Sequence, residues 1–173
     1  MVIWLIGMSG AGKTTLGRQV YEFWKSQACN TVFVDGDEIR QIFKQDQTPE
    51  AYSLERRAAN ADQIAQLCAW LDRQQINVVC CTLSIFEETR RWNRLQYSKY
   101  FEVYIHVPLE ILTKRDRKNL YQPALRGELK NVVGVDIPFV PPRSSDLVID
   151  NSSEGLDVAT CARRILRNAG VYC

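Results

Sequence analysis

Near its N-terminus this 173-residue chain carries the stretch Gly7-Met8-Ser9-Gly10-Ala11-Gly12-Lys13-Thr14, which matches the pattern GxxxxGK[ST] at every fixed position. An apolar run, Val2–Ile6, precedes it, and a helical pattern follows from Lys13. A strand, a glycine-rich turn and a helix in this order form a loop whose backbone N–H groups point at phosphate oxygens, with the positive end of the helix dipole behind them. Because both the motif and its context are present, a chance glycine turn is a poor explanation, and the stretch predicts a P-loop that binds a nucleoside triphosphate.

The residue types in this loop suggest separate tasks. Lys13 can reach the β- and γ-phosphates of ATP, and Thr14 can offer its hydroxyl to Mg²⁺. ATP and Mg²⁺ are therefore the expected cofactors. The other predicted ATP contacts in the loop are Gly7, Ser9, Gly10, Ala11, Gly12 and Thr15.

Short apolar runs and longer helical patterns alternate along the chain. The runs are too continuously apolar for strands with one wet face, as expected of parallel strands that are covered on both sides. The alternation predicts an α/β protein with a P-loop kinase fold, in which helices flank a five-stranded parallel sheet, as a single domain over residues 1–173. Strands are predicted at 2–6, 31–34, 77–81, 101–107 and 147–149, and helical patterns at 13–26, 56–74, 85–97 and 155–168.

The composition argues against several classes of protein. A net charge of +2 implies no strong field for nucleic acid, and no apolar run approaches the ~20 residues of a membrane span. The first apolar run is short and leads straight into the glycine-rich loop, so no signal peptide is expected and the cytoplasm is the predicted location. With one histidine and no CxxC pair a zinc cluster is not expected, and the six cysteines are interpreted as buried free thiols.

Two acidic residues follow the second predicted strand, in Asp35-Gly36-Asp37. The chain has no NKxD tetrapeptide of a GTPase, and its third strand ends in Cys80-Cys81-Thr82 without a Walker-B aspartate. Carboxylates after the second strand are typical of small-molecule P-loop kinases, where the acceptor meets them at the carboxyl ends of the strands. A turn with an N-cap aspartate fits the same residues, and one aspartate can cap while the other acts on the acceptor.

The segment Asn119–Arg143 is irregular and contains Gly127, Gly134 and four of the six prolines. A long irregular stretch in a compact domain is usually a lid or a binding loop. With the basic residues before it, the segment predicts a mobile lid over about 115–143 that would bring cations over the transferring phosphate and exclude water. The cations of this stretch are Arg115, Arg117, Lys118, Arg126 and Lys130.

Taken in order, these motifs resemble those of adenylylsulfate (APS) kinases. Beside the P-loop, the resemblance is carried by Asp35-Gly36-Asp37-Glu38-Ile39-Arg40 and by a block from Arg115 to Asp136 that reads RDRKNLY, GELKN and GVD. The family uses ATP to phosphorylate the 3′-hydroxyl of APS. The resemblance therefore implies phosphoryl transfer to a small nucleotide acceptor, and it implies a homodimer.

The resemblance also implies roles for individual residues. Asp37 and Asp35 are the candidates for activating the acceptor hydroxyl, with Lys13 as the third catalytic residue. Thr14, together with Asp35, would hold Mg²⁺. The implied ATP contacts from the lid are Arg115 and Lys118, and the implied acceptor contacts are Asp37, Arg40, Arg57, Leu83, Ser84, Lys130 and Val132. For the substrate arginine at the start of the second helical pattern, the sequence leaves the choice between Arg56 and Arg57 open.

Departures from the family concern the acceptor's base. The LGFS-type segment has no clear counterpart between Gln45 and Ser53, and an aliphatic residue, Val132, stands where the family has an aromatic one. Stacking of a base on an aromatic ring contributes about 1–3 kcal/mol, so the base is left open between adenine and cytosine. The aromatic residues that could substitute are Phe43, Tyr52, Phe86 and Phe139.

Three functions remain as hypotheses. APS as the acceptor comes first, because the resemblance extends over most of the chain. A cytidine diphosphoramidate kinase, which would phosphorylate the 3′-hydroxyl of a cytidine nucleotide in surface-polysaccharide synthesis, comes second. A non-catalytic nucleotide-binding protein comes last, because the P-loop and both aspartates are intact.

Overall fold

The computed structural model describes residues 1–116, 118–153 and 155–171, so Arg117 and Cys173, for which predictions were made, lie outside the described residues. Its five strands form one parallel sheet in the order β2-β3-β1-β4-β5, which confirms the predicted fold class. Each strand begins and ends within a residue of its predicted range. The strands are β1 (Val2–Ile6), β2 (Thr31–Asp35), β3 (Asn77–Thr82), β4 (Tyr100–His106) and β5 (Leu147–Asp150).

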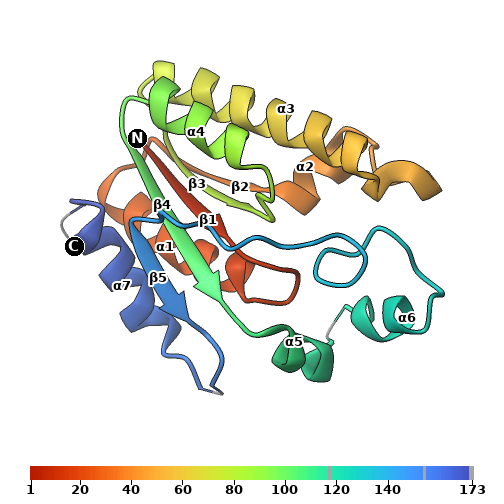
Figure 1. The fold of residues 1–173 in the computed structure, drawn as a ribbon. Coiled ribbons are helices and arrows are strands. Elements are labelled where there is room, and N and C mark those ends of the chain that lie inside the picture. Colours follow the sequence, from red (N-terminus) through yellow and green to blue (C-terminus); the bar gives the residue numbers. More distant parts are fainter. Residues whose placement is uncertain (117, 154, 172–173) are drawn as a thin grey trace.

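Helices cover both faces of the sheet: α3 and α4 lie on one face, and α1 and α7 on the other (Figure 1). These four correspond to the predicted helical patterns. The short helices α2, α5 and α6 were not predicted, because a helix of five to seven residues is too short to show a clear hydrophobic period. The helices are α1 (Lys13–Gln27), α2 (Gly36–Ile42), α3 (Leu54–Arg73), α4 (Glu87–Gln96), α5 (Leu109–Arg115), α6 (Tyr121–Leu125) and α7 (Val158–Asn168), with a 3₁₀ turn, η1, at Pro49–Tyr52.

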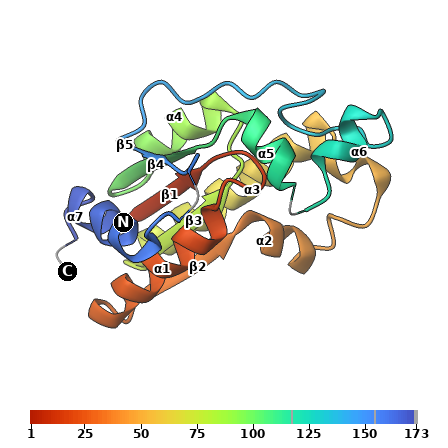
Figure 2. The ribbon, with the colours of Figure 1, turned by 90° about the horizontal axis from the view of Figure 1, so that it is seen from below.

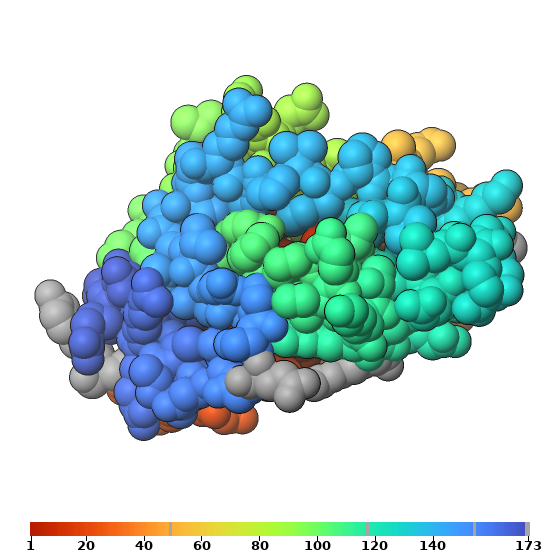
Figure 3. All heavy atoms as spheres, turned by 60° about the horizontal axis from the view of Figure 1, so that its bottom comes forward, coloured from red at the N-terminus to blue at the C-terminus, as the bar shows by residue number. Residues whose placement is uncertain are grey.

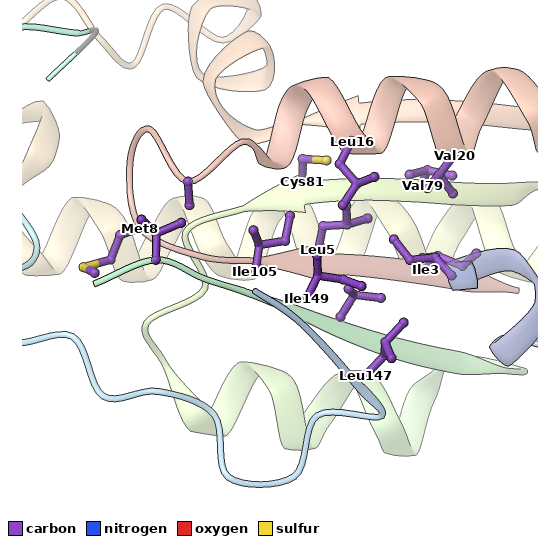
Figure 4. Close-up of a cluster of buried hydrophobic side chains, with 14 of the residues drawn as sticks. Ile3, Leu5, Met8, Leu16, Val20, Val79, Cys81, Ile105, Leu147 and Ile149 are labelled. Atoms are coloured by element: carbon purple, nitrogen blue, oxygen red, sulfur yellow. The ribbon is translucent and has the colours of Figure 1, made fainter. Parts of the chain in front are cut away.

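The central strand, β1, is buried along its whole length. Because successive side chains of a strand point to opposite faces, Ile3 and Leu5 pack beneath α1 and α7, whereas Trp4 packs beneath α3. The same alternation puts Cys81 and Cys80 in different cores. Figure 4 shows the first core, with Cys81 next to α1.

The five described cysteines are free thiols, as predicted. Three of them are buried and Cys161 is half-buried, but Cys29 is exposed, so the expectation of burial is wrong at that position. It lies in the turn between α1 and β2, which the sheet does not cover. No helix in the described ranges is long and apolar enough to cross a bilayer.

The predicted lid region contains more regular structure than its composition suggests. The carboxylate of Asp116 accepts hydrogen bonds from the backbone N–H groups at the start of α6. Further on, the carboxylate of Asp136 accepts hydrogen bonds from the backbone N–H groups of Asn131 and Val132, at 2.5 and 2.6 Å. Val132 is buried in the core, so the compact loop 131–137 is anchored to the domain.

Residues 138–146 run back from this loop to β5 along one side of the molecule (Figures 2 and 3). Arg94 of α4 holds the end of this segment, because its guanidinium donates to the carbonyl of Ser144 at 2.8 Å and to the carboxylate of Asp146 at 3.0 Å. The backbone N–H of Glu102 in β4 donates to the same carboxylate. The segment between the lid and β5 is therefore attached to the sheet.

A glycine on α1 allows the helix to lie close to the sheet. A Cβ atom on Gly17 would overlap Sγ of Cys81 and lie 3.1 Å from the ring of Phe33. Since α1 begins at the P-loop lysine, this contact also sets the position of the P-loop relative to β3.

We expect Gly17→Ala to lower the free energy of unfolding by about 1–3 kcal/mol, because the added methyl group overpacks the contact with Cys81. Urea denaturation measures the change. The double variant Gly17→Ala with Cys81→Ala should recover part of the loss relative to the sum of the two single variants. Strictly additive losses would show that the sulfur is not the group that is crowded.

Candidate active site

A cleft of about 500 Å³ lies at the carboxyl ends of the strands, between the P-loop, the end of β2, the loop after β3 and the lid region. Most of the residues predicted to act in catalysis or binding line it. They are Ser9, Gly10, Gly12, Lys13, Thr14, Thr15, Asp35, Asp37, Arg40, Arg57, Leu83, Ser84, Lys118, Lys130 and Val132.

Three predicted ATP contacts do not line the cleft. Gly7 and Ala11 support the loop from behind: a Cβ on Gly7 would lie 2.8 Å from the carbonyl oxygen of Ile105, and Ala11 is buried. Arg115 instead donates hydrogen bonds to backbone carbonyls after β5, those of Asn151 and Ser152, at 3.0 and 2.9 Å. Its contact with ATP stays a prediction.

The shape of the P-loop depends on groups outside the motif. The side chain of Asn151 donates to the carbonyl of Ala11 at 2.9 Å, and it lies so close to Gly12 that a Cβ there would be 2.8 Å away. Gly12 also has a φ of 97°, a conformation that favours glycine. On the other side of the loop, the hydroxyl of Tyr121 in α6 donates to the carbonyl of Ser9 at 2.8 Å.

Lys13 lies at the centre of this loop, and its ammonium group donates to the carbonyl of Met8 at 3.0 Å. Burial lowers the pKa of Lys13, and the carboxylates of Asp37 and Asp35 act in the opposite direction. An ammonium group beside the inward-facing backbone of the loop suits a polyphosphate.

Asp35 connects the P-loop with the element that follows β2. One of its carboxylate oxygens accepts a hydrogen bond from the hydroxyl of Thr14 at 2.7 Å. The other accepts a hydrogen bond from the backbone N–H of Asp37 at 2.9 Å and so caps α2. A hydroxyl and a carboxylate at this spacing are oxygen donors of the kind that Mg²⁺ prefers. Among the described residues no cluster of three acidic, cysteine or histidine side chains could hold a metal, so phosphate oxygens and water would have to complete the shell.

Asp37 points into the cleft and pairs with the lid. Its carboxylate lies 2.7 Å from the ammonium group of Lys118, and both side chains are more than half exposed. Burial of part of the group acts to raise the pKa of Asp37, but the bond from Lys118 and the charges of Lys13 and Arg40 outweigh it and lower the pKa. Asp37 is therefore an ionised carboxylate that can accept a hydrogen bond from a substrate hydroxyl.

Two arginines line the part of the cleft farther from the P-loop. Arg40 of α2 is buried and donates to the carbonyl of Ala51 at 2.9 Å. Arg57 of α3 donates to the carbonyl of Asn131, at 2.8 Å, and so connects α3 with the loop 131–137.

Ser84 lies in the loop after β3, with a φ of 54°, and its hydroxyl accepts a hydrogen bond from the indole N–H of Trp4 at 3.2 Å. Its carbonyl accepts a bond from Arg90 at 2.8 Å. These bonds hold the loop against the end of the sheet.

Several lining or supporting residues were not among the predicted site residues. Asn60 lines the cleft and accepts a hydrogen bond from Arg40 at 3.3 Å, but an asparagine inside a helical pattern gives no signal of its own. Tyr121 lay within the RDRKNLY block, which did provide a signal. Asn151 follows the last strand, and only the folded structure brings it to the P-loop.

The charged residues that line the cleft are mostly basic. Five cationic side chains, Lys13, Arg40, Arg57, Lys118 and Lys130, face two carboxylates, those of Asp35 and Asp37. Such a cleft favours ligands that carry several negative charges.

The two aspartates should differ in their effect on stability. We expect Asp35→Ala to lower the free energy of unfolding by about 2 kcal/mol, because a helix cap and the partner of Thr14 are lost. Asp37→Ala should cost less than about 1 kcal/mol, because its ion pair is exposed. Urea denaturation of both variants provides the comparison, and equal losses would contradict the structural role assigned to Asp35.

The family model described as "Adenylylsulphate kinase" matches residues 1–150. Among curated proteins, a cytidine diphosphoramidate kinase of Campylobacter jejuni is 42% identical over 151 residues, covering 87% of this chain and 86% of the relative. A probable adenylyl-sulfate kinase of Archaeoglobus fulgidus is 34% identical, covering 86% of this chain and 94% of the relative.

Solved structures share the fold. The APS kinase CysC of Mycobacterium tuberculosis, solved in complex with AMPPNP and APS, superposes with a TM-score of 0.83 at 24% sequence identity, covering 98% of this chain and 96% of that structure. The P-loop, the order of the strands and the family match over residues 1–150 agree with one another. The chain belongs to the adenylylsulphate kinase family of nucleotide-binding P-loop phosphotransferases.

Proposed function

We propose that this protein transfers the γ-phosphate of MgATP to the 3′-hydroxyl of a nucleotide that carries a small activated group. The observation that carries this proposal is the common cleft in which the P-loop lysine, Lys13, and the ionised carboxylate of Asp37 face each other, with further cations around them. Phosphoryl transfer requires positioning and neutralisation of charge more than covalent chemistry.

Each group then has a defined task. Lys13 and the backbone of the P-loop bind the β- and γ-phosphates, and Thr14 and Asp35 hold Mg²⁺, which neutralises charge that develops on the phosphates. Asp37 accepts the hydrogen bond of the acceptor hydroxyl and orients it for attack. Lys118, now paired with Asp37, is close enough to the P-loop to add positive charge at the transferring phosphate.

For the acceptor, we infer that a cytidine nucleotide is the better candidate, ahead of APS, which the resemblance in sequence had put first. The cytidine diphosphoramidate kinase is more similar to this chain, at 42% identity, than the adenylyl-sulfate kinase, at 34%. Of the four aromatic residues considered for stacking, Tyr52 and Phe86 line the cleft, whereas Phe43 does not and Phe139 packs on Tyr104. The buried Val132 offers no ring. The large ring system of adenine would therefore gain less stacking energy in this cleft than in a family member with aromatic residues on both sides of the base.

APS remains the second candidate because the family model bears that name and because the adenylyl-sulfate kinases match over most of this chain. A non-catalytic role is the least supported, since the proposed catalytic residues all line one cleft. The homodimer implied by the family stays a prediction.

Release of ADP, measured with ATP, Mg²⁺ and a panel of acceptors, tests the function. We expect turnover with a cytidine diphosphate derivative, and a kcat/KM at least a hundredfold above that for APS, a difference of about 2.7 kcal/mol in transition-state stabilisation. Lys13→Ala is the control that should abolish transfer without unfolding the protein. A higher kcat/KM for APS would reverse the order of the two acceptors, and no transfer to any nucleotide would refute the function.

Asp37→Asn should lower kcat by about a hundredfold or more while the KM for ATP changes by less than about threefold, because the proposed contact is with the acceptor hydroxyl. Steady-state kinetics with both substrates varied will show the effect. If the variant raises only the KM for ATP, Asp37 belongs to the metal or nucleotide site, and Asp35 becomes the candidate for the acceptor hydroxyl.

A further inference from the structure

Arg40 is a buried cation that forms no ion pair with the described residues. Its side chain lies inside the cleft wall, and the residue is 7% exposed. None of its nitrogens lies within 4.0 Å of a carboxylate oxygen in the described part of the chain. Its guanidinium donates to the carbonyl of Ala51 and to Asn60, which leaves three of the five N–H groups of an arginine without a protein partner among the described residues. Burial of a charge is costly unless it is paired, so an anionic ligand is expected at this position.

Arg57, on the neighbouring helix α3, is half-buried and also lines the cleft. It also has no carboxylate within 4.0 Å in the described ranges. Its Nε–H donates to the carbonyl of Tyr52 at 2.8 Å, and its Nη2 donates to the carbonyl of Asn131 at 2.8 Å. These two bonds fix the plane of the guanidinium relative to both the cleft wall and the lid. Burial, followed by the positive charge of Arg40, lowers the pKa of Arg57.

The ring of Tyr52 lies against both cations. The Cζ atom of Arg40 is 5.1 Å from the ring centroid, and the Cζ atom of Arg57 is 5.3 Å from it. Contacts of this kind are attractive, because the face of an aromatic ring carries partial negative charge. Two like charges repel each other, and an aromatic ring in contact with both offsets part of this repulsion.

We propose that Tyr52 is a positioning residue: its ring holds Arg40 and Arg57, which the family resemblance already implies as acceptor contacts, as a pair whose guanidinium groups can meet adjacent anionic groups of the acceptor together. This inference rests on the proposed function and adds to it the residue that orients these two acceptor contacts. Guanidinium groups bind phosphate oxygens through paired N–H groups in a fixed plane. The ring of Tyr52 is thereby assigned to the arginines, and its task is to orient them.

Binding of the acceptor in the absence of turnover provides the test. The probes are cytidine 5′-diphosphate and APS, titrated by calorimetry into the protein with the P-loop saturated by a non-hydrolysable ATP analogue. We expect Tyr52→Leu to weaken binding of the preferred probe about tenfold, which corresponds to about 1.4 kcal/mol. Tyr52→Phe should stay within about twofold of the wild type, because the ring and the backbone carbonyl are both retained.

Two further variants separate positioning from other effects. Arg57→Lys retains the charge but loses the planar fork, so it should weaken the probe as Tyr52→Leu does. Tyr21→Leu is the matched control: the ring of Tyr21 contacts Lys25 at 5.1 Å but does not line the cleft, and this variant should bind the probe as the wild type does. The affinity for the ATP analogue should be unchanged in all four variants.

Wild-type affinity in Tyr52→Leu would overturn the inference, as would equal losses in Tyr52→Phe and Tyr52→Leu, which would assign the effect to the hydroxyl. A parallel loss of affinity for the ATP analogue would also overturn it. These outcomes differ from a failure of the proposed function, which is the absence of transfer by the wild-type protein to any nucleotide. In steady-state kinetics Tyr52→Leu and Arg57→Lys should raise the KM for the acceptor, with kcat within about threefold of the wild type, whereas Tyr52→Phe and Tyr21→Leu should leave this KM unchanged.

Discussion

The carboxylate of Asp35 connects two parts of the site that are distant in the sequence. One oxygen binds the hydroxyl of Thr14 at the start of α1, and the other caps α2 through the N–H of Asp37. The direction of α2 therefore depends on the same group that would help to hold the metal, and α2 carries both Asp37 and Arg40. A shift of the P-loop would therefore also move the residues on the acceptor side of the cleft.

The P-loop itself is supported from three sides. Gly17 allows α1 to pack closely on β3 at Cys81. Asn151, which follows β5, and Tyr121 of the lid helix α6 each donate a hydrogen bond to a carbonyl of the loop. These supports come from elements spread over the whole chain. The loop can present its N–H groups to phosphate without reorganisation because the sheet and three connecting segments already determine its shape.

The lid region consists of parts with different attachments. The loop 131–137 is anchored through Val132 and through the bond from Arg57, and the segment that leads to β5 is attached to Arg94. Lys118, in contrast, is held to the cleft by one exposed ion pair with Asp37. Exposed pairs contribute little to stability, so the part of the lid around Lys118 can exchange its partner for a phosphate at small cost. The buried Arg40 and the adjacent Arg57 provide the fixed positive charge of the cleft, whereas Lys118 provides charge that can move.

Sequence alone sufficed for the class of fold, the P-loop and the family. The motif from Gly7 to Thr14 has meaning only between a strand and a helix, and the apolar runs supplied that context within a few residues. Helices of seven residues or fewer escaped detection because they complete too few turns to show a period. The loop 131–137 was missed because it is ordered by the carboxylate of Asp136, which accepts hydrogen bonds from backbone N–H groups within the same loop.

The partners of Arg40, Tyr52 and Arg57 could not be predicted from the sequence either. Contacts between α2, η1, α3 and the lid depend on how the helices pack on the sheet, and the spacing of residues along the sequence does not give the distance between packed elements. The residues of the phosphate-binding loop are consecutive in the sequence, so the motif alone reveals them. The shape and charge that select the acceptor come from side chains that are distant in the sequence and meet only after the sheet has formed.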